Sequence, residues 1–572
     1  MTQRRRLTAV ARGAAAADLY LRGATLLNVY TGELYAANVA CAGERIAYVG
    51  PRADMVGPRT TVLDAAGRVL VPGYIDPHVH PAHLVTPSSL ARHVLPLGTT
   101  TLFADTLHFW ELGGLRAFRT AADALARSPL KFYWMIRPHA QSRSRDEARR
   151  FRLADLARAM AHPAVIAMGE VTRWPDAWSG APSLLERLEL AHRRRLRVEG
   201  HTAGAAAEKI PAIAAAGFTS DHEPITAREV LERARQGIAV MLRESSLRPD
   251  LIGLLDALKE APGLAGRVML TCDGSMPAFI RAHGFVDHLI RVALERGVPP
   301  VDAYRMATIN AATYYGLDAH LGGIAPGRFA DICVLRDLAE PRPETVVARG
   351  RLAAREGRLL VRVPEVPWRR AFVSDEARLT VRWRARPDDF ALPVRDRYPV
   401  VALVSAVITR LEDRAPGPGD LRAALVDRGG RWVAPGLVAG FGDAIDGLAT
   451  TISTDFNILV LGRSPEAMAR AANRLLDLRG GLALVDGERI EFELALPLGG
   501  VMGVGTLEQA AACEEALRTR LVARGYPHHE PLFSLFFLAA DFLPTVRLTS
   551  RGVWDVKRGR VLLPARRRRR GR

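Results

Sequence analysis

The stretch YIDPHVHPAHL, residues 74–84, decides the fold, because it joins a short apolar run to an acid and two histidines. Side chains alternate between the two faces of a strand, so His78 and His80 point to one face and Val79 to the other. Two imidazoles on one face at a strand end can hold a metal ion. Surface or core histidines would give the same pattern, so the other strand ends of the chain have to be compared.

From Pro72 onward, strand-like runs alternate with helical segments, which is typical of βα units and a parallel sheet. Thr86 and Pro87, for example, predict a capped helix start after the first run. The runs are VLVPGYIDPHVH, TTTLFAD, KFYWMIRPHA, AVIAMGEV, LRVEGHTA, GFTSDHE, GIAVMLRES and RVMLTCDGS. They predict a (β/α)₈ barrel over residues 73–322. A doubly wound open sheet is the main alternative, but no glycine-rich phosphate fingerprint follows the first strand.

Short β-like runs separated by glycine turns flank the barrel on both sides. We expect residues 1–72 and 323–371 to form one composite β-sandwich domain, because both segments consist of short β-like runs separated by glycine turns. NILVLG, SPEAMARAANRLLDL and GGLALVDGERI predict an α+β domain with a basic tail over residues 372–572. The predicted fold class is α/β: a TIM-like barrel, a small composite β-sandwich domain and a C-terminal α+β domain.

Composition indicates a globular protein, with 48% hydrophobic and 24% charged residues in 572. No uninterrupted apolar run approaches the roughly 20 residues that span a bilayer, and no clean cleavage signal follows the basic N-terminus. We therefore expect a cytoplasmic location and no membrane partner. Cys41, Cys272, Cys333 and Cys513 lie far apart, which excludes a zinc ribbon and gives no disulfide framework.

The net charge of +18 raises the question of nucleic acid, but lysine occurs at only four positions and the arginines are spread along the chain. We expect no specific nucleic-acid partner. The arginine run at residues 566–572 is predicted to be a solvated tail, with a weak polyanion contact as the alternative.

Barrel enzymes carry their catalytic groups at the C-terminal ends of the strands. Five of the eight predicted strands end in a metal-ligand residue, which favours a metal site over surface or core histidines. The set has four imidazoles and two carboxylates and suits two divalent cations: His78, His80, Glu170, His201, His222 and Asp273.

Charge and geometry predict how the set divides. His78, His80 and Asp273 would hold one ion, and His201 and His222 the second. Two cations repel, so an anionic bridge is needed; no lysine ends any of these strands, which leaves Glu170 as the bridge. Metal binding can lower the pKa of water to about 7, and Asp273 would carry the proton to the leaving group. The chemistry predicted is hydrolysis of an amide, a cyclic amide or an amidine.

These segments resemble the adenine deaminase family of the amidohydrolase superfamily, over nearly the whole chain. The matching stretches include PGYIDPHVH, VLPLGTTTLFAD, MGEV, AAAGFTSDHEPITAREVLERARQGIAVMLRES, GGIAPGRFADICVL, NRLLDLRGGLALVDG and LTSRGVWDVKRG. The resemblance implies conversion of adenine to hypoxanthine and ammonia in purine salvage. It also implies two Mn²⁺ or Fe²⁺ ions, with Zn²⁺ as the alternative, and it places the family's ligands on the same six residues.

Four stretches depart from the family pattern. Where the family has HVHIESS and TDDRHP, this chain has HVHPAHL and TCDGSMP. The family's DPHE is replaced by DTLHF, with Leu107 at the histidine position and His108 one residue later. The family's HDSHN is replaced by STDFN, in which only Asn457 is retained. These departures bear on the substrate more than on the reaction. One alternative is a related amidohydrolase acting on another 6-substituted purine, a cyclic amidine or a cyclic amide. A non-catalytic binding homologue is the other.

Several residues have weaker claims. Glu223 is predicted to act in catalysis, by contacting substrate or orienting the neighbouring His222. Arg243, Glu244 and Ser245 end the seventh strand and are predicted to bind the purine edge, with an internal salt bridge as the alternative.

Five aromatic and imidazole side chains near the same rim are expected to be bystanders or packing residues. A stacking lid is the alternative for the two tryptophans. They are His83, His108, His139, Trp174 and Trp178. Overall we expect a homo-oligomer with a small purine as its substrate.

Overall fold

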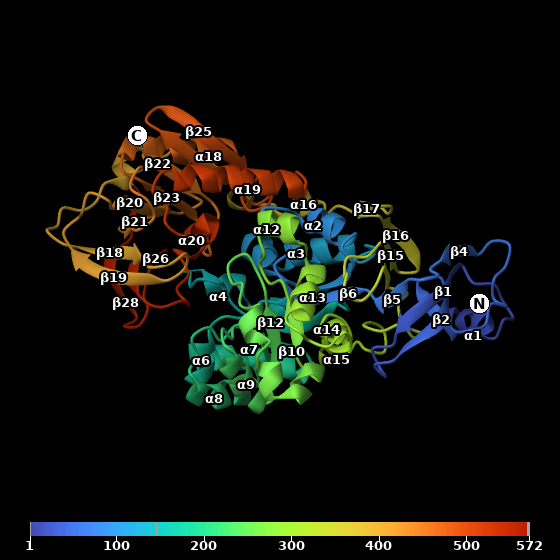
Figure 1. The fold of residues 1–572 in the computed structure, drawn as a ribbon. Helices are drawn as coiled ribbons and strands as arrows, with labels where there is room; N and C mark the ends of the chain where they lie inside the picture. The colour runs from blue at the N-terminus through green and yellow to red at the C-terminus, as the bar shows by residue number, and fades with distance from the viewer. Residues whose placement is uncertain (1, 145, 569–572) are drawn as a thin grey trace.

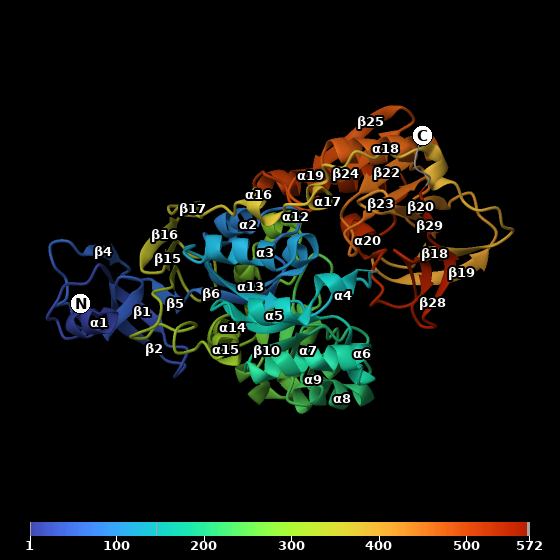
Figure 2. The same ribbon diagram turned by 180° about the vertical axis from the view of Figure 1, so that it is seen from behind.

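The computed structural model describes residues 2–144 and 146–568. An N-terminal sheet region, a central barrel and a C-terminal region follow one another, and the barrel lies between the other two in both views (Figure 1, Figure 2). No helix in these residues has both the length and the apolar character needed to cross a membrane. Residues 569–572 of the predicted arginine tail lie outside the described residues.

The N-terminal sheet is built from strands that precede the barrel and strands that follow it. β5 pairs with β14 in antiparallel fashion, with Leu70 opposite Val334, so the chain returns to its first sheet after leaving the barrel. Helix α1 (Gln3–Ala11) packs on β2 and β3. The strands are β1 Leu19–Leu27, β2 Leu34–Ala42, β3 Arg45–Gly50, β4 Thr61–Asp64, β5 Val69–Pro72, β14 Ile332–Leu335, β15 Thr345–Ala348, β16 Arg351–Arg355 and β17 Arg358–Leu359.

Eight parallel strands form the barrel in the order of the chain. A bridge between Val79 and Asp273 joins the first strand to the segment just after the last strand, so the sheet closes. This confirms the predicted α/β class with a (β/α)₈ barrel and additional sheets. The strands are β6 Tyr74–Val79, β7 Thr99–Asp105, β8 Lys131–Ile136, β9 Val165–Val171, β10 Arg197–Gly200, β11 Ser220–Asp221, β12 Ala239–Arg243 and β13 Met269–Thr271.

Helices surround this barrel, and the first begins as predicted: Thr86 Oγ1 accepts a hydrogen bond from Ser89 N at 3.1 Å, with Pro87 in the first turn. The barrel helices are α2 Pro87–Val94, α3 Leu107–Leu125, α4 Glu147–Arg150, α5 Leu153–Met160, α6 Trp174–Trp178, α7 Pro182–Arg193, α8 Ile210–Ala215, α9 Ala227–Arg235, α10 Leu251–Leu254, α11 Ala257–Glu260, α12 Pro277–His283, α13 Val286–Glu295, α14 Pro300–Met306 and α15 Ile309–Tyr314.

The barrel interior is filled with apolar side chains. One cluster takes a residue from each of six strands: Ile75, Phe103, Met135, Ala167, Met241 and Met269, all buried. Because these side chains fill the barrel interior, the polar side chains at the C-terminal ends of the strands point toward the barrel mouth.

The C-terminal region holds a second large sheet, and two of its helices reach the barrel. Helix α19 packs on α12, and α20 lies over the barrel mouth (Figure 1). The sheet strands are β18 Tyr398–Leu403, β19 Thr409–Arg414, β20 Leu421–Val426, β21 Trp432–Ala439, β22 Gly447–Thr450, β23 Ile458–Gly462, β24 Gly481–Asp486, β25 Arg489–Ala495 and β29 Arg566–Arg567. A small sheet has β26 Val546–Thr549, β27 Gly552–Asp555 and β28 Arg560–Pro564. The helices are α16 Trp368–Ala371, α17 Asp375–Arg378, α18 Pro465–Asp477, α19 Leu507–Val522 and α20 Pro531–Phe537.

Candidate metal centre and active site

Three of the predicted ligands meet where β6 and β13 end. The Nε2 atoms of His78 and His80 are 3.3 Å apart. Asp273 Oδ1 lies 3.4 Å from the first and 3.3 Å from the second. A single ion could therefore contact all three side chains.

The other two histidines form a second group beside the first. His201 Nδ1 is 3.3 Å from His222 Nε2, at the ends of β10 and β11. Glu170 lies between the groups, because its Oε1 is 2.5 Å from His201 Nδ1 and its Oε2 is 3.5 Å from His80 Nε2. The structure thus brings all six predicted residues together, in overlapping sets of three whose ligand atoms lie within 4.8 Å of one another.

Asp76, the acid of the opening stretch, is not part of this set. It is fully buried, and its carboxylate accepts hydrogen bonds from His78 N at 3.1 Å, Cys272 N at 3.1 Å and Thr271 Oγ1 at 2.8 Å. Asp76 therefore ties β6 to β13 and holds the backbone that carries His78.

Two carboxylates that the sequence analysis missed stand behind the histidines. Glu199 on β10 accepts from His222 Nδ1 at 2.6 Å, and its other oxygen lies 3.4 Å from His78 Nδ1. Asp105 at the end of β7 lies 3.5 Å from His80 Nδ1. A carboxylate on one imidazole nitrogen leaves the other nitrogen free to bind a metal. Both residues end, or nearly end, a predicted strand, so the rule that found the ligands could have found them.

Arg137, also missed, fills the space between β7 and β9. It is fully buried; its Nε donates to Asp105 at 2.7 Å, and its two Nη atoms donate to Glu170 and Gln141. One guanidinium therefore fixes the carboxylate that lies between the two histidine groups.

The electrostatic field at the centre favours cations. Burial alone would lower the pKa of His80, but Asp105 and Asp273 outweigh it and raise that pKa to about 9. Six carboxylates and three guanidinium groups touch the imidazoles or one another, which leaves a net charge of three negative when the imidazoles are neutral, as they are in metal ligands. They are Asp105, Glu170, Glu199, Glu223, Asp250, Asp273, Arg137, Arg243 and Arg248.

A cavity of about 290 Å³ opens above the centre. Its floor is polar and includes His80, Glu170, His201 and Asp273. Its roof is apolar and comes largely from the C-terminal region: Val407, Ile408, Phe533, Phe536, Phe537, Phe542, Leu543 and Pro544. Charged groups below a water-excluding wall are the usual composition of a small-molecule site.

Three of the four remaining predicted site residues line this cavity. They are Glu223, Arg243 and Ser245. Arg243 forms internal salt bridges, which was the alternative to purine binding: its Nη1 donates to Glu223 and, at 3.1 Å, to Asp273 Oδ2. Burial raises the pKa of Glu223, but Arg243, together with His201, His222 and Arg248, outweighs it and lowers that pKa to about 2.

Glu244 does not have its predicted position. Side chains alternate along the strand, so the residue after Arg243 points away from the cavity. The Glu244 carboxylate accepts a hydrogen bond from Leu251 N at 3.2 Å, and the residue is not part of the cavity lining.

The four stretches that depart from the family pattern meet at one corner of the cavity. His83 stacks on His80 at 5.3 Å, and His108 contacts the rings of His83 at 5.1 Å and Phe456 at 5.5 Å. Gly274 completes the corner, because a Cβ at this position would lie 2.9 Å from His83 Cε1. His83 and His108 are therefore close neighbours of the centre, and the changes at these stretches fit one another.

The tryptophans after β9 do not reach the cavity lining. Lys209 lies over both rings, 5.2 Å from the centroid of Trp174 and 4.9 Å from that of Trp178. The packing interpretation of these residues fits the structure better than a stacking lid.

Known protein families match the barrel and the C-terminal region of the chain separately. Residues 69–353 match the amidohydrolase family, and residues 411–560 match the adenine deaminase C-terminal domain. A closed barrel with this cluster of histidines and carboxylates at its mouth is thus an amidohydrolase domain.

Relatives extend the match to nearly the full length. A provisionally named adenine deaminase of Halalkalibacterium halodurans is 35% identical, over 98% of both chains. An adenine deaminase of Cenarchaeum symbiosum is 35% identical, over 97% of this chain and 93% of its own. An adenine deaminase of Cereibacter sphaeroides is 35% identical, over 96% of this chain and 98% of its own. The chain belongs to the adenine deaminase family and is a hydrolase acting on C–N bonds.

Proposed function

We propose that the chain hydrolyses adenine to hypoxanthine and ammonia, as a cytoplasmic enzyme of purine salvage. The observation that carries this proposal is the convergence of six metal-ligand side chains beneath one cavity. Relatives that are named adenine deaminases over nearly their full length support it.

We propose two divalent ions, Mn²⁺ or Fe²⁺, with Zn²⁺ as the alternative. His78, His80 and Asp273 would hold one ion, His201 and His222 the other, and Glu170 both. The presence of two histidine groups with Glu170 facing both supports this number. When bound, such ions lower the pKa of water, so that hydroxide is available near neutral pH.

Asp273 is the proposed proton carrier. Its Oδ1 faces the two histidines and its Oδ2 accepts from Arg243 at 3.1 Å. Burial would raise its pKa, but hydrogen bonds from His78 and His80 hold that pKa well below its ordinary value, so the group is an anion. It would take the proton of the attacking water and deliver it to the departing amine.

Glu223 and the phenylalanine wall would hold the base. The Glu223 carboxylate lines the cavity 3.5 Å from His201 Nδ1 and can accept a hydrogen bond from a ring N–H of a purine. Phe536 and Phe542 offer flat apolar faces for the ring, and their burial over it would exclude water.

A second candidate is an aminopurine with a less polar substituent at position 6. The observation that favours it is the corner of His83, His108, Gly274 and Phe456, where the stretches that depart from the family pattern meet beside the cavity. We also propose that the chain forms a homo-oligomer and takes a purine, rather than nucleic acid, as its partner.

A substrate panel tests these proposals. The measurement is kcat/KM for ammonia or amine release from adenine, 6-alkylaminopurines and cyclic amides, with protein reconstituted with Mn²⁺ or Fe²⁺. We expect adenine to be deaminated, with a weaker KM than in an enzyme that carries the family's usual residues. Turnover of a cyclic amide without ammonia from adenine would replace the proposal, and full metal content without turnover of any compound would favour a binding homologue.

A further inference from the structure

A separate cavity of about 320 Å³ lies at the boundary between the barrel and the C-terminal region. Its walls come from the loops after β8 and β9, from α4 and α7, and from the turn between β26 and β27. The lining residues are His139, Arg143, Ser144, Glu147, Arg173, Asp176, Ser183, Arg187 and Arg551, with Ala148 and Leu184.

Two of its four arginines are neutralised by carboxylates. Arg143 Nη2 lies 2.9 and 3.0 Å from the oxygens of Asp176. Arg173 binds Glu147 with two nitrogens, at 2.7 and 2.6 Å. These four charges cancel within the cavity wall.

The other two arginines have no carboxylate partner among the residues that the structure describes. Arg187 donates to the carbonyl oxygens of Ser183 and Phe151, and the guanidinium of Arg551 lies 5.3 Å from the ring centroid of Trp554. Asp541, another acid close to Arg143, accepts from Arg143 N at 3.1 Å and does not line the cavity. The lining therefore has two uncompensated positive charges.

His139 adds an acceptor without a donor. The side chain is 4% exposed, and its Nδ1 lies 2.9 Å from the carbonyl oxygen of Ala140. A carbonyl only accepts, so the hydrogen is on Nδ1 and Nε2 keeps its lone pair. Nε2 has no partner among the described residues, and a buried acceptor left without a donor is unfavourable.

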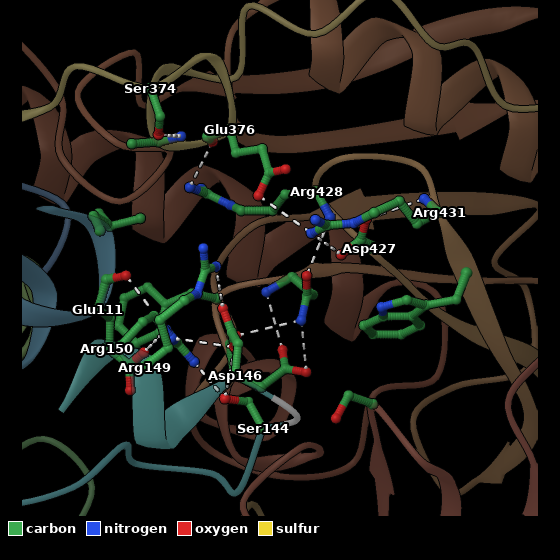
Figure 3. Close-up of a pocket in the computed structure, with 17 residues that line it drawn as sticks. Glu111, Ser144, Asp146, Arg149, Arg150, Ser374, Glu376, Asp427, Arg428 and Arg431 are labelled. Carbon is green, nitrogen blue, oxygen red and sulfur yellow. Dashed lines mark hydrogen bonds and ion pairs between the residues drawn. The ribbon is translucent and has the colours of Figure 1, made fainter. Parts of the chain in front are cut away.

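The adjoining cavity shows a different arrangement. It shares Ser144 and has a volume of about 410 Å³ (Figure 3). There Arg149 pairs with Asp146, Arg150 with Glu111 and Arg431 with Asp427. Arg428 donates to the carbonyl oxygens of Glu376 and Gly499, and the five carboxylates of that lining outnumber its four arginines. An excess of arginines over carboxylates distinguishes the smaller cavity.

We propose that the smaller cavity binds a phosphate group, as inorganic phosphate or as a phosphate monoester. Arg187 and Arg551 would contact the phosphate oxygens, because guanidinium groups match phosphate geometry. His139 Nε2 would accept a hydrogen bond from a hydroxyl of the phosphate or of the group that it esterifies. The volume is that of a small-ligand site, which leaves room for an attached sugar. Since Arg551 belongs to the C-terminal region, the ligand would also join that region to the barrel.

Calorimetric titration of the full-length, metal-loaded protein tests the site. The probes are inorganic phosphate, ribose 5-phosphate, AMP and sulfate at constant ionic strength. We expect saturable binding of at least one phosphate compound, with sulfate weaker because it has no hydroxyl for His139. The compound that binds most tightly identifies free phosphate, sugar phosphate or nucleotide as the source.

Variants separate this site from the general positive charge of the chain. We expect Arg187→Gln and Arg551→Gln each to weaken binding about tenfold or more, the range of one charge-assisted hydrogen bond. Arg551 is exposed, so its variant keeps the test valid if Arg187→Gln fails to fold. Arg193→Gln, an exposed arginine on the same helix α7, is the matched control and should change nothing. Absence of phosphate binding, sulfate binding as tight as phosphate, or equal weakening by Arg193→Gln would overturn the proposal.

Discussion

Glu170 is the residue on which the proposed centre depends most, since its two carboxylate oxygens face different histidine groups and Arg137 donates to one of them. A glutamine at this position keeps the shape but offers one oxygen and no charge. Two cations on either side would then repel one another without an anion between them.

We predict that Glu170→Gln abolishes turnover and lowers the metal content below two ions per chain. Metal analysis and ammonia release measure the two effects on the same preparation. Glu189→Gln, an exposed carboxylate on α7, is the control and should keep both. Normal metal content with normal activity in Glu170→Gln would contradict the two-ion centre.

Asp273→Asn separates metal binding from proton transfer. We expect it to keep much of its metal, because the four histidines and Glu170 remain, and to lose activity by at least the ~10²–10⁴-fold that general acid–base groups contribute. Steady-state kinetics on fully metallated protein measure the loss. A near-normal rate would move the proton role to another group, with Glu223 the first candidate because it shares Arg243 with Asp273.

Glu199→Gln tests whether a carboxylate behind the histidines positions them. Glu199 holds the Nδ1 sides of His78 and His222, so losing its charge should weaken metal affinity by about 10–100-fold. Competition with a chelator measures the affinity, and excess metal should restore much of the activity. If Glu199→Gln bound metal as tightly as the parent chain, its role would be packing alone.

The sequence predicted the six converging residues because one rule, reading the ends of alternating runs, applies to each separately. It did not predict Glu199, Asp105 or Arg137 as members of the site. The same rule could have found Glu199 and Asp105, which stand at or near strand ends, but not their roles, because the histidines that they contact depend on strand order and stagger. Glu244 lies outside the cavity lining for a related reason: it directly follows β12, and its side chain takes the face opposite to that of Arg243.

At the scale of elements, helix α20 forms much of the cavity roof. In the sequence, the segment FSLFFLAADFL at residues 533–543 is distinguished only by its apolar character. Its position over the barrel depends on tertiary contacts, such as Phe536 with His83 at 5.8 Å and the hydrogen bond from Thr454 N to the Phe536 carbonyl at 3.0 Å. No local pattern specifies those contacts.

We predict that Phe536→Ala raises KM for the base with a smaller effect on kcat, because the ring faces substrate rather than the reacting atoms. Loss of a stacking face corresponds to about 1–3 kcal/mol, or roughly five- to 150-fold in KM. Trp178→Ala is the control and should leave both constants unchanged, because this ring lies against Lys209 and is not part of the cavity lining. Unchanged KM in Phe536→Ala would exclude this ring from base binding.

At the scale of the whole molecule, the order of the strands was predictable and their assembly was not. The eight barrel strands follow one another as predicted, because parallel βα units impose sequential neighbours. The docking of the C-terminal region on the barrel mouth depends on surfaces that carry no periodic signal. We propose three domains: a composite β-sandwich domain of residues 1–72 and 323–371, the barrel of residues 73–322, and the C-terminal α+β domain of residues 372–572.

The central claim is that this chain is a two-metal adenine deaminase, and one titration tests it most directly. Mn²⁺ is added to metal-free protein, and ammonia release from saturating adenine is followed against the ratio of bound ions to chains. We predict no activity without metal and a maximum when two ions are bound, since Glu170 faces both histidine groups. Full activity at zero ions, or no ammonia from adenine with two ions bound, would contradict the account.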